Sequence, residues 1–142
     1  MRRPSIAVSA MLACLVLSAA CDNSGSPSTS PTPGVSVTET FNGTVQPMST
    51  DSHNFTITQS GDVTVTLTAA GPPATIFMGL GVGTPNATDG SCTLLQGAST
   101  SAQAGTTPQL AGQATAGTFC VSVFDLGNQT AAISYTVTVV HT

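Results

Sequence analysis

The sequence predicts an all-β fold, a two-layer antiparallel β-sandwich of about eight short strands. Hydrophobic and polar residues alternate with a period of two in several short segments, which is the pattern of half-buried strands. Clusters of Gly, Pro, Asn, Asp and Ser separate these segments and indicate turns. After the N-terminal region, no segment combines helix-forming residues with a hydrophobic repeat of i, i+3, i+4 and i+7, so we expect at most one helical turn.

The clearest alternation occurs in three segments. In Gly61–Thr68, Val and Leu side chains fall on one face and Thr side chains fall on the other. Ile133–Val139 alternates in the same way and places Tyr135 on the inward face, and Phe119–Val123 repeats the pattern. Thr suits the outer face because it is β-branched and its hydroxyl is polar without charge. Each segment is therefore predicted to be a strand with one buried face.

Five shorter segments complete the predicted sandwich. They are Val37–Val45, Asn54–Gln59, Thr75–Val82, Cys92–Gln96 and Gln109–Ala114. Gly79, Gly81 and Gly83 alternate in and directly after the third of these segments, which indicates a bend or a close approach. Four phenylalanines are interpreted as core residues, namely Phe41, Phe55, Phe77 and Phe119. Phe124 adjoins a turn and is interpreted as the aromatic most suited to a contact.

The first 20 residues have the order of a secretory signal peptide. Arg2 and Arg3 form a basic start, the uncharged stretch Ile6–Ala20 follows, and this stretch ends in small residues. It is 15 residues long, short of the roughly 20 that a helix needs to cross a bilayer. The chain is therefore predicted to be exported and to have no permanent transmembrane helix.

The end of this signal, Leu17–Cys21, resembles the lipobox of bacterial lipoproteins, in which a cysteine after small residues is acylated and becomes the first mature residue. Ala19 and Ala20 fit the pattern, whereas Ser18 stands where the family usually has Leu. The resemblance implies lipidation of Cys21 and an anchor in a membrane of the cell envelope, without indicating which membrane. The alternative interpretation is ordinary cleavage near Ala20, which leaves Cys21 as a thiol.

A linker and one domain follow. Asn23–Gly34 consists of Asn, Ser, Thr, Pro and Gly and has nothing to bury, so residues 21–34 are predicted to be the lipidated cysteine and a linker. The remaining 108 residues, Val35–Thr142, suffice for one domain and are too few for two. Within this domain Cys92 and Cys120 are predicted to form a disulfide, because disulfides persist in exported proteins. The alternative, a metal site, lacks the CxxC or Cys/His spacing of such sites, and no cofactor is predicted.

Five segments of the domain, in their order of strands and turns, resemble the bacterial pre-peptidase C-terminal domain. They are Thr40–Val45, His53–Ile57, Gly61–Leu67, Ala116–Val123 and Tyr135–Val139. The resemblance implies a jelly-roll-like sandwich, generally non-catalytic, that occurs beside secreted peptidases and in other exported proteins, some of which bind matrix protein or polysaccharide. Some related collagen-binding domains hold calcium with clustered acidic residues. The acidic residues here are scattered singly, so no calcium site is predicted and no functional residue is carried over.

The charge of the chain restricts its partners. Arg2 and Arg3 are the only basic residues, and all six acidic residues lie after the signal, so the chain without its signal has a formal charge of −6 with His neutral. This excludes nucleic acid as a specific partner, because affinity for phosphate backbones comes from Lys and Arg. Anionic lipid headgroups and phosphorylated substrates are disfavoured for the same reason.

Few residues are available for catalysis. His53 and His141 are the only histidines. Asp51, Ser52 and His53 are adjacent, but neighbours in a strand point to opposite faces, so this trio is interpreted as the turn into the second strand and not as a catalytic triad. His141 ends the last predicted strand and is expected to be solvated. We therefore expect no enzymatic activity.

Three functional hypotheses follow. The first is a lipid-anchored accessory or binding domain that contacts an extracellular protein or glycan through its loops. The second is a structural envelope component without a discrete ligand, and the third is an unrecognised secreted hydrolase. An exposed aromatic side chain with polar neighbours would favour the binding domain. Sheet faces covered uniformly by Thr would favour the structural component. A His beside a Ser and a carboxylate in a cleft would favour the hydrolase.

Overall fold

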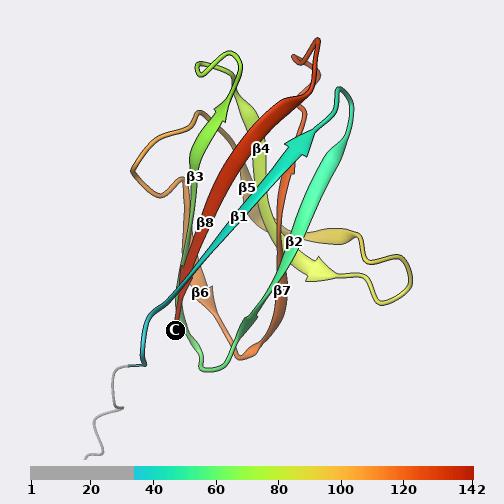
Figure 1. The fold of residues 1–142 in the computed structure, drawn as a ribbon. Helices are drawn as coiled ribbons and strands as arrows, with labels where there is room; N and C mark the ends of the chain where they lie inside the picture. Colours follow the sequence, from blue (N-terminus) through green and yellow to red (C-terminus); the bar gives the residue numbers. More distant parts are fainter. Residues whose placement is uncertain (1–33) are drawn as a thin grey trace, which may run out of the picture. The chain divides into compact units, whose positions relative to one another are not determined.

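The computed structural model describes residues 34–142, which form eight β-strands and no helix (Figure 1). The strands are β1 (Val37–Val45), β2 (Thr50–Ile57), β3 (Gly61–Gly71), β4 (Met78–Pro85), β5 (Cys92–Ala102), β6 (Leu110–Ala114), β7 (Gly117–Phe124) and β8 (Ile133–His141). They make two antiparallel four-stranded sheets with the orders β1-β8-β3-β6 and β2-β7-β4-β5. Successive strands alternate between the two sheets except for β4 and β5, which pair with each other in one sheet. The predicted two-layer antiparallel β-sandwich of eight strands is therefore confirmed.

The core lies between the two sheets and consists of the inward-facing residues of each strand. In β8 the side chains of Ile133, Tyr135, Val137 and Val139 are buried, and those between them are more exposed, as the period of two predicts. Burying a Val, Leu or Ile side chain contributes about 1.5 to 3 kcal/mol relative to its exposure to water. The alternation read from the sequence therefore identifies the side chains that hold the sheets together.

The second strand begins earlier than the sequence predicts. Asp51, Ser52 and His53 were expected to form a turn, and this was wrong: they pair with β7 within β2. The turn lies one step upstream, where the Ser49 amide donates to the Gln46 carbonyl at 3.0 Å. Polar residues are tolerated in this part of β2 because β2 is an edge strand of its sheet.

The glycines of β4 allow close approach, as predicted. A Cβ atom at Gly79 would overlap the ring of Phe124, and one at Gly81 would overlap the side chain of Leu94. Phe124 therefore lies over β4 and is only partly exposed, so it is less available for a contact than the sequence suggests. Phe77, by contrast, was expected in the core and is 48% exposed, because β4 begins after it and Met78 takes the buried position.

The sandwich has one end at which several loops meet. Strand β1 runs from the lower end in Figure 1 to the upper end, and three connections lie at that upper end: residues 46–49, 72–77 and 125–132. We call these three connections the loop end. The described chain starts at the opposite end, where Gly34 lies beside Gln59 and Thr142. The loop end and the point where the chain enters the sandwich are thus at opposite ends of β1.

Candidate functional site

The structure tests some of the predicted site residues and leaves others outside it. Cys21, the signal peptide and all of the linker except Gly34 lie outside the described residues. Cys92 and Cys120 form the predicted disulfide, which connects the edge strand β5 to β7 across the intervening strand β4. The disulfide therefore fixes an edge strand to the middle of its sheet.

A cluster of polar side chains lies between β1, β2 and β8. The Tyr135 hydroxyl donates to Asp51 Oδ2 at 2.9 Å, and His53 Nε2 lies 2.9 Å from the same hydroxyl. Since Tyr135 uses its single proton on Asp51, its oxygen accepts a hydrogen bond from the N–H of His53. The Phe41 ring stacks on the His53 ring with centroids 5.0 Å apart, and the absence of a side chain at Gly43 makes room for the hydroxyl and the carboxylate. We call these five residues the polar latch.

The polar latch joins strands of both sheets and does not form a hydrolytic triad. Ser52 lies on the other face of β2, where its hydroxyl donates to Ser122 Oγ at 3.1 Å, so it is separated from Asp51 and His53. Burial raises the pKa of Tyr135, and the hydrogen bond and charge of Asp51 raise it further. The phenol therefore stays protonated and serves as a hydrogen-bond donor. The arrangement closes one side of the sandwich.

His141 was expected to be solvated, and this was wrong. Its side chain is 2% exposed, and its Nε2 lies 2.9 Å from Glu39 Oε1. Strand β8 is internal to its sheet and pairs with β1 and β3 as far as His141, so its end is held on both sides. The odd-numbered residues of β8 face inward, and His141 continues that row with its ring 5.7 Å from that of Phe55.

The loop end is organised by one carboxylate. Asp125 Oδ2 accepts from the Met48 amide at 2.8 Å, and Asp125 Oδ1 accepts from the amides of Gly127, Asn128 and Gln129 at 2.9, 3.1 and 3.2 Å. The bond from Met48, followed by those from its own loop, lowers the pKa of Asp125 below its ordinary value even though the group is solvent-accessible. Asp125 therefore ties the 46–49 and 125–132 connections together in its ionised form.

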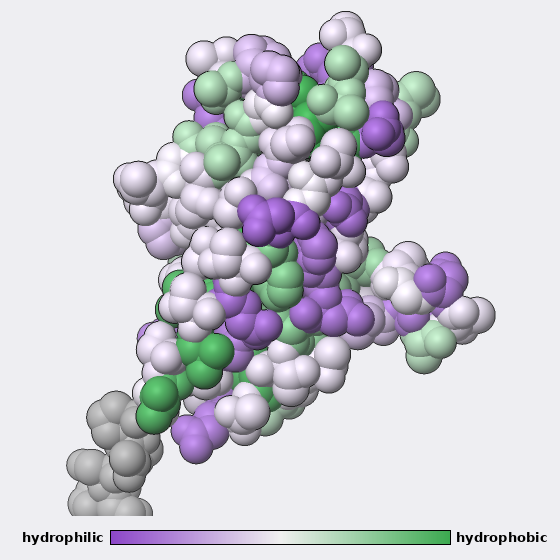
Figure 2. Space-filling view, in the orientation of Figure 1, coloured by the Kyte–Doolittle hydropathy of each residue, from purple (hydrophilic) through white to green (hydrophobic). Residues whose placement is uncertain are grey.

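A side chain of the same loop secures the third connection. Asn128 Nδ2 donates to the Phe77 carbonyl at 3.0 Å. Met48, Phe77 and Leu126 are exposed by 93%, 48% and 45%, and each belongs to one of the three connections. Figure 2 shows hydrophobic side chains among polar ones at this upper end and others at the lower end, where Val35 and Val37 are also exposed. The loop end thus presents hydrophobic side chains on loops that are hydrogen-bonded to each other.

Sequence reasoning identified neither Met48 nor Leu126. Both stand in turn sequences, Gln46–Ser49 and Asp125–Asn128, that carry no periodic pattern. The sequence nonetheless contained a usable signal. A large hydrophobic residue inside a surface turn has no buried face to occupy, so it is expected to be exposed. The meeting of the loops in space depends on sheet topology, which the sequence pattern did not specify.

Within residues 34–142, no three His, Cys, Asp or Glu side chains gather in a way that could hold a metal ion. The described residues also include no helix long and apolar enough to cross a membrane. No family model matches the chain, and no curated protein matches it.

Proposed function

We propose that this chain is a non-catalytic lipoprotein of the cell envelope whose β-sandwich binds a partner protein through the loop end. The observation that carries the proposal is the set of exposed side chains Met48, Phe77 and Leu126 on loops held together by Asp125. Exposed hydrophobic side chains on rigid loops lose little conformational entropy on binding, which favours affinity. Phe and Met are also enriched in the cores of protein interfaces.

The anchor and the loop end fit this function together. Lipidation of Cys21 would hold the chain at a membrane, and the 12 residues Asn23–Gly34 would let the domain stand roughly 20 Å from it as a flexible coil. Within the domain, the loop end lies at the opposite end of β1 from Gly34. The loop end is therefore not covered by the point at which the linker joins the domain. The resemblance to the pre-peptidase C-terminal domain supports an accessory role of this kind.

A glycan is the second candidate partner. Phe77 is an exposed aromatic residue with the polar neighbour Asn128, and an exposed aromatic with polar neighbours is the feature expected of a contact with protein or glycan. The residues that commonly stack on sugar rings are Trp and Tyr; the chain has no Trp, and Tyr135 is buried in the polar latch. Protein is therefore favoured over glycan. The structural hypothesis is disfavoured, because it requires surfaces covered by Thr without such a patch.

The test places a photo-crosslinking amino acid at single positions of the full chain in intact cells. Phe77 is the test position, and Thr56, which is exposed on the sheet face of β2, is the matched control. We expect a discrete adduct at Phe77 and none at Thr56. Equal labelling at the two positions, or none at Phe77, would favour a structural role without a discrete partner.

The anchor is tested separately by the intact mass of the protein from membranes. We expect a chain that begins at Cys21 and carries acyl chains, and we expect that increment to disappear in Cys21→Ala. A soluble, unacylated product would refute the lipoprotein part of the proposal and leave the loop end to be tested on a secreted protein.

A further inference from the structure

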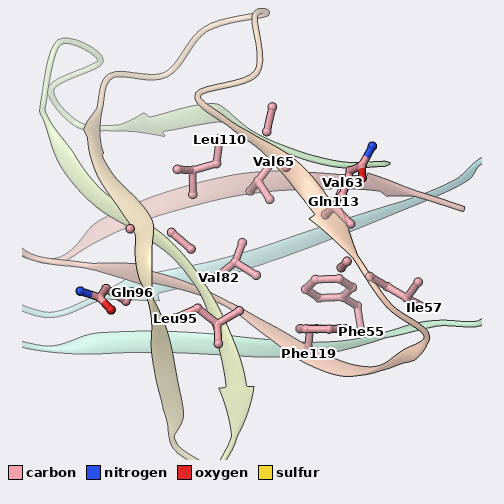
Figure 3. A pocket seen from close by; sticks show the side chains of 15 residues that line it. Phe55, Ile57, Val63, Val65, Val82, Leu95, Gln96, Leu110, Gln113 and Phe119 are labelled. Atoms are coloured by element: carbon pink, nitrogen blue, oxygen red, sulfur yellow. The ribbon is translucent and has the colours of Figure 1, made fainter. Parts of the chain in front are cut away.

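A second feature lies on the side of the sandwich away from the polar latch. There a cleft of about 200 Å³ opens between the edge strands β5 and β6, one from each sheet (Figure 3). Core side chains from both sheets form its floor, among them Phe55 and Val65, and Leu110 and Leu95 stand at its two sides. In Figure 3 these hydrophobic side chains converge on one space. We call this space the apolar cleft.

The apolar cleft exists because one inward-facing position of β6 has no side chain. Leu110 pairs with Val65, and Gly112 pairs with Val63, so both positions of β6 face the core. A Cβ atom added at Gly112 would meet no other atom within 4 Å. The inward row of β6 is therefore interrupted above Val63, and the space is not taken by any neighbouring group.

A bulge in β5 keeps the other side of the cleft open. Gly81 of β4 pairs with Ser99, and Gly83 pairs with Leu94, so the four residues 95–98 stand opposite the single residue Val82. Gly97 within this bulge has φ of 77°, a value that suits glycine. An extra stretch of this kind turns a strand away from its neighbour. The bulge thus places Leu95 at the rim of the cleft, where it is 43% exposed.

The lining of the cleft determines which ligand it suits. It contains no charged side chain, and its polar side chains are the amides of Gln96 and Gln113 on the two edge strands. Burying an ionised group without a partner is costly, so a charged ligand is disfavoured. An apolar cavity of about 150 Å³ already binds a ligand of the size of benzene. We propose that the apolar cleft binds the hydrocarbon chain of an uncharged ligand.

Two sources share this chemistry, a separate neutral lipid and the acyl chain proposed on Cys21. The chain enters the sandwich at Gly34, beside Gln59, and Gly61 at the same end pairs with Ala114 of the cleft lining. The 12 residues between Cys21 and Gly34 would span roughly 20 Å on the basis of their composition, so the acyl chain proposed on Cys21 would be within range. The experiment therefore compares acylated and unacylated protein.

The probe is 1-octanol, titrated into full-length Cys21→Ala protein while the methyl resonances of Val63, Val65 and Leu110 are followed by NMR. We expect saturable shifts at these methyl groups. Octanoate, which has the same chain length and a negative charge, is expected to bind at least about tenfold more weakly because its carboxylate finds no cation. Shifts that do not saturate, or equal affinities for the two probes, would overturn the proposal.

Two variants give a matched comparison. Gly112→Leu fills the cleft from an inward position of β6 and is expected to weaken octanol binding by at least about tenfold. Thr68→Leu adds the same side chain at an exposed position of β3 that does not line the cleft, and it is expected to leave the affinity within about twofold. Octanol binding to Gly112→Leu as tight as to the parent would overturn the proposal. Leu95→Gln, at the exposed rim, provides a second variant if Gly112→Leu does not fold.

The acylated protein identifies the source of the ligand. A weaker apparent affinity for octanol than in Cys21→Ala would mean that the protein's own acyl chain competes for the cleft. Equal affinities would assign the cleft to a separate neutral lipid. Absence of octanol binding in both proteins would overturn the proposal, whatever the result of crosslinking at Phe77.

Discussion

The two edge strands of one sheet each contain an inward-facing glycine, and they differ in what fills the space beside it. Gly43 in β1 and Gly112 in β6 both lie on edge strands of the sheet β1-β8-β3-β6, and both face the core. The position of a side chain at Gly43 is occupied by the Asp51 carboxylate and the Tyr135 hydroxyl, whereas that at Gly112 is empty. An edge-strand glycine therefore accommodates a neighbouring group in one case and leaves a ligand-sized space in the other.

The two sides of the sandwich differ in charge as well. The polar latch carries an acidic residue and a histidine, and Glu39 and His141 make a second polar contact on β1. Strands β5 and β6 contain no charged residue and no proline, the features that usually protect an exposed edge from pairing with another chain. We call the side with the polar latch the closed side and the side with the apolar cleft the open side. The closed side is thus suited to stability, and the open side is suited to contact with an apolar ligand.

The largest expected effect on the free energy of unfolding comes from removing the disulfide that holds β5 in place on the open side. Replacing Cys92 and Cys120 together by Ala removes a bridge between residues 28 apart in sequence and should cost about 3 to 4 kcal/mol in the free energy of unfolding, measured by urea denaturation. Hydrogen exchange should accelerate most in β5, because that edge strand then depends on β4 alone. Equal acceleration in β1 and β5 would show that the two sides are not distinct.

The next effect concerns the closed side. Gly43→Ala would force a methyl group into the Asp51 carboxylate and the Tyr135 hydroxyl, and it should destabilise the domain by about 2 kcal/mol. The measurement is again urea denaturation. Gly105→Ala is the control, because a Cβ atom there would meet only the end of the Gln109 side chain, at 3.8 Å. A neutral result at Gly43 would mean that the polar latch can rearrange without cost.

A smaller effect is expected from the phenol of the polar latch. Because the folded pKa of Tyr135 is raised, its contribution to stability is complete below the ordinary tyrosine pKa of about 10 and is lost as the pH rises above it. Tyr135→Phe should cost about 1 to 2 kcal/mol at neutral pH, since Asp51 and His53 lose their shared partner. The variant should also lose part of the alkaline decrease in thermal stability. An unchanged alkaline profile in Tyr135→Phe would assign that decrease to another group.

The contrast between these edges also marks what the sequence can predict. The alternation in Gly61–Thr68 and Ile133–Val139 determined the strands, their buried faces and the fold class, because period-two burial is a local property. The disulfide was predicted from the expected export of the chain and from the two cysteines of the domain. The predictions were wrong where burial depends on neighbours that are distant in sequence or on the exact start of a strand. His141 is buried because β8 is an internal strand, and Phe77 is exposed because β4 starts after it.

The candidate sites were less predictable than the fold. Asp125 reads as a turn residue, and only the topology reveals that its carboxylate reaches the Met48 amide, 77 residues away in sequence. The apolar cleft depends on Gly112 and on a bulge in β5 at residues 95–98, which overlaps the predicted end of that strand at Gln96. Both features require the pairing register of distant strands, which a hydrophobic pattern does not contain.

The smallest expected effect has the opposite sign and tests the comparison most directly. Gly112→Ala places a methyl group in empty space within a strand, so it should stabilise the domain by about 0.5 to 1 kcal/mol through reduced freedom of the unfolded chain and added contact. Measured beside Gly43→Ala, it compares the same chemical change at the two edges of one sheet. If Gly112→Ala destabilised the domain as Gly43→Ala is expected to, β6 would have to pack more tightly than its empty inward position indicates. Opposite signs at Gly43 and Gly112 would establish that the open side is underfilled, which is the physical requirement for a ligand there.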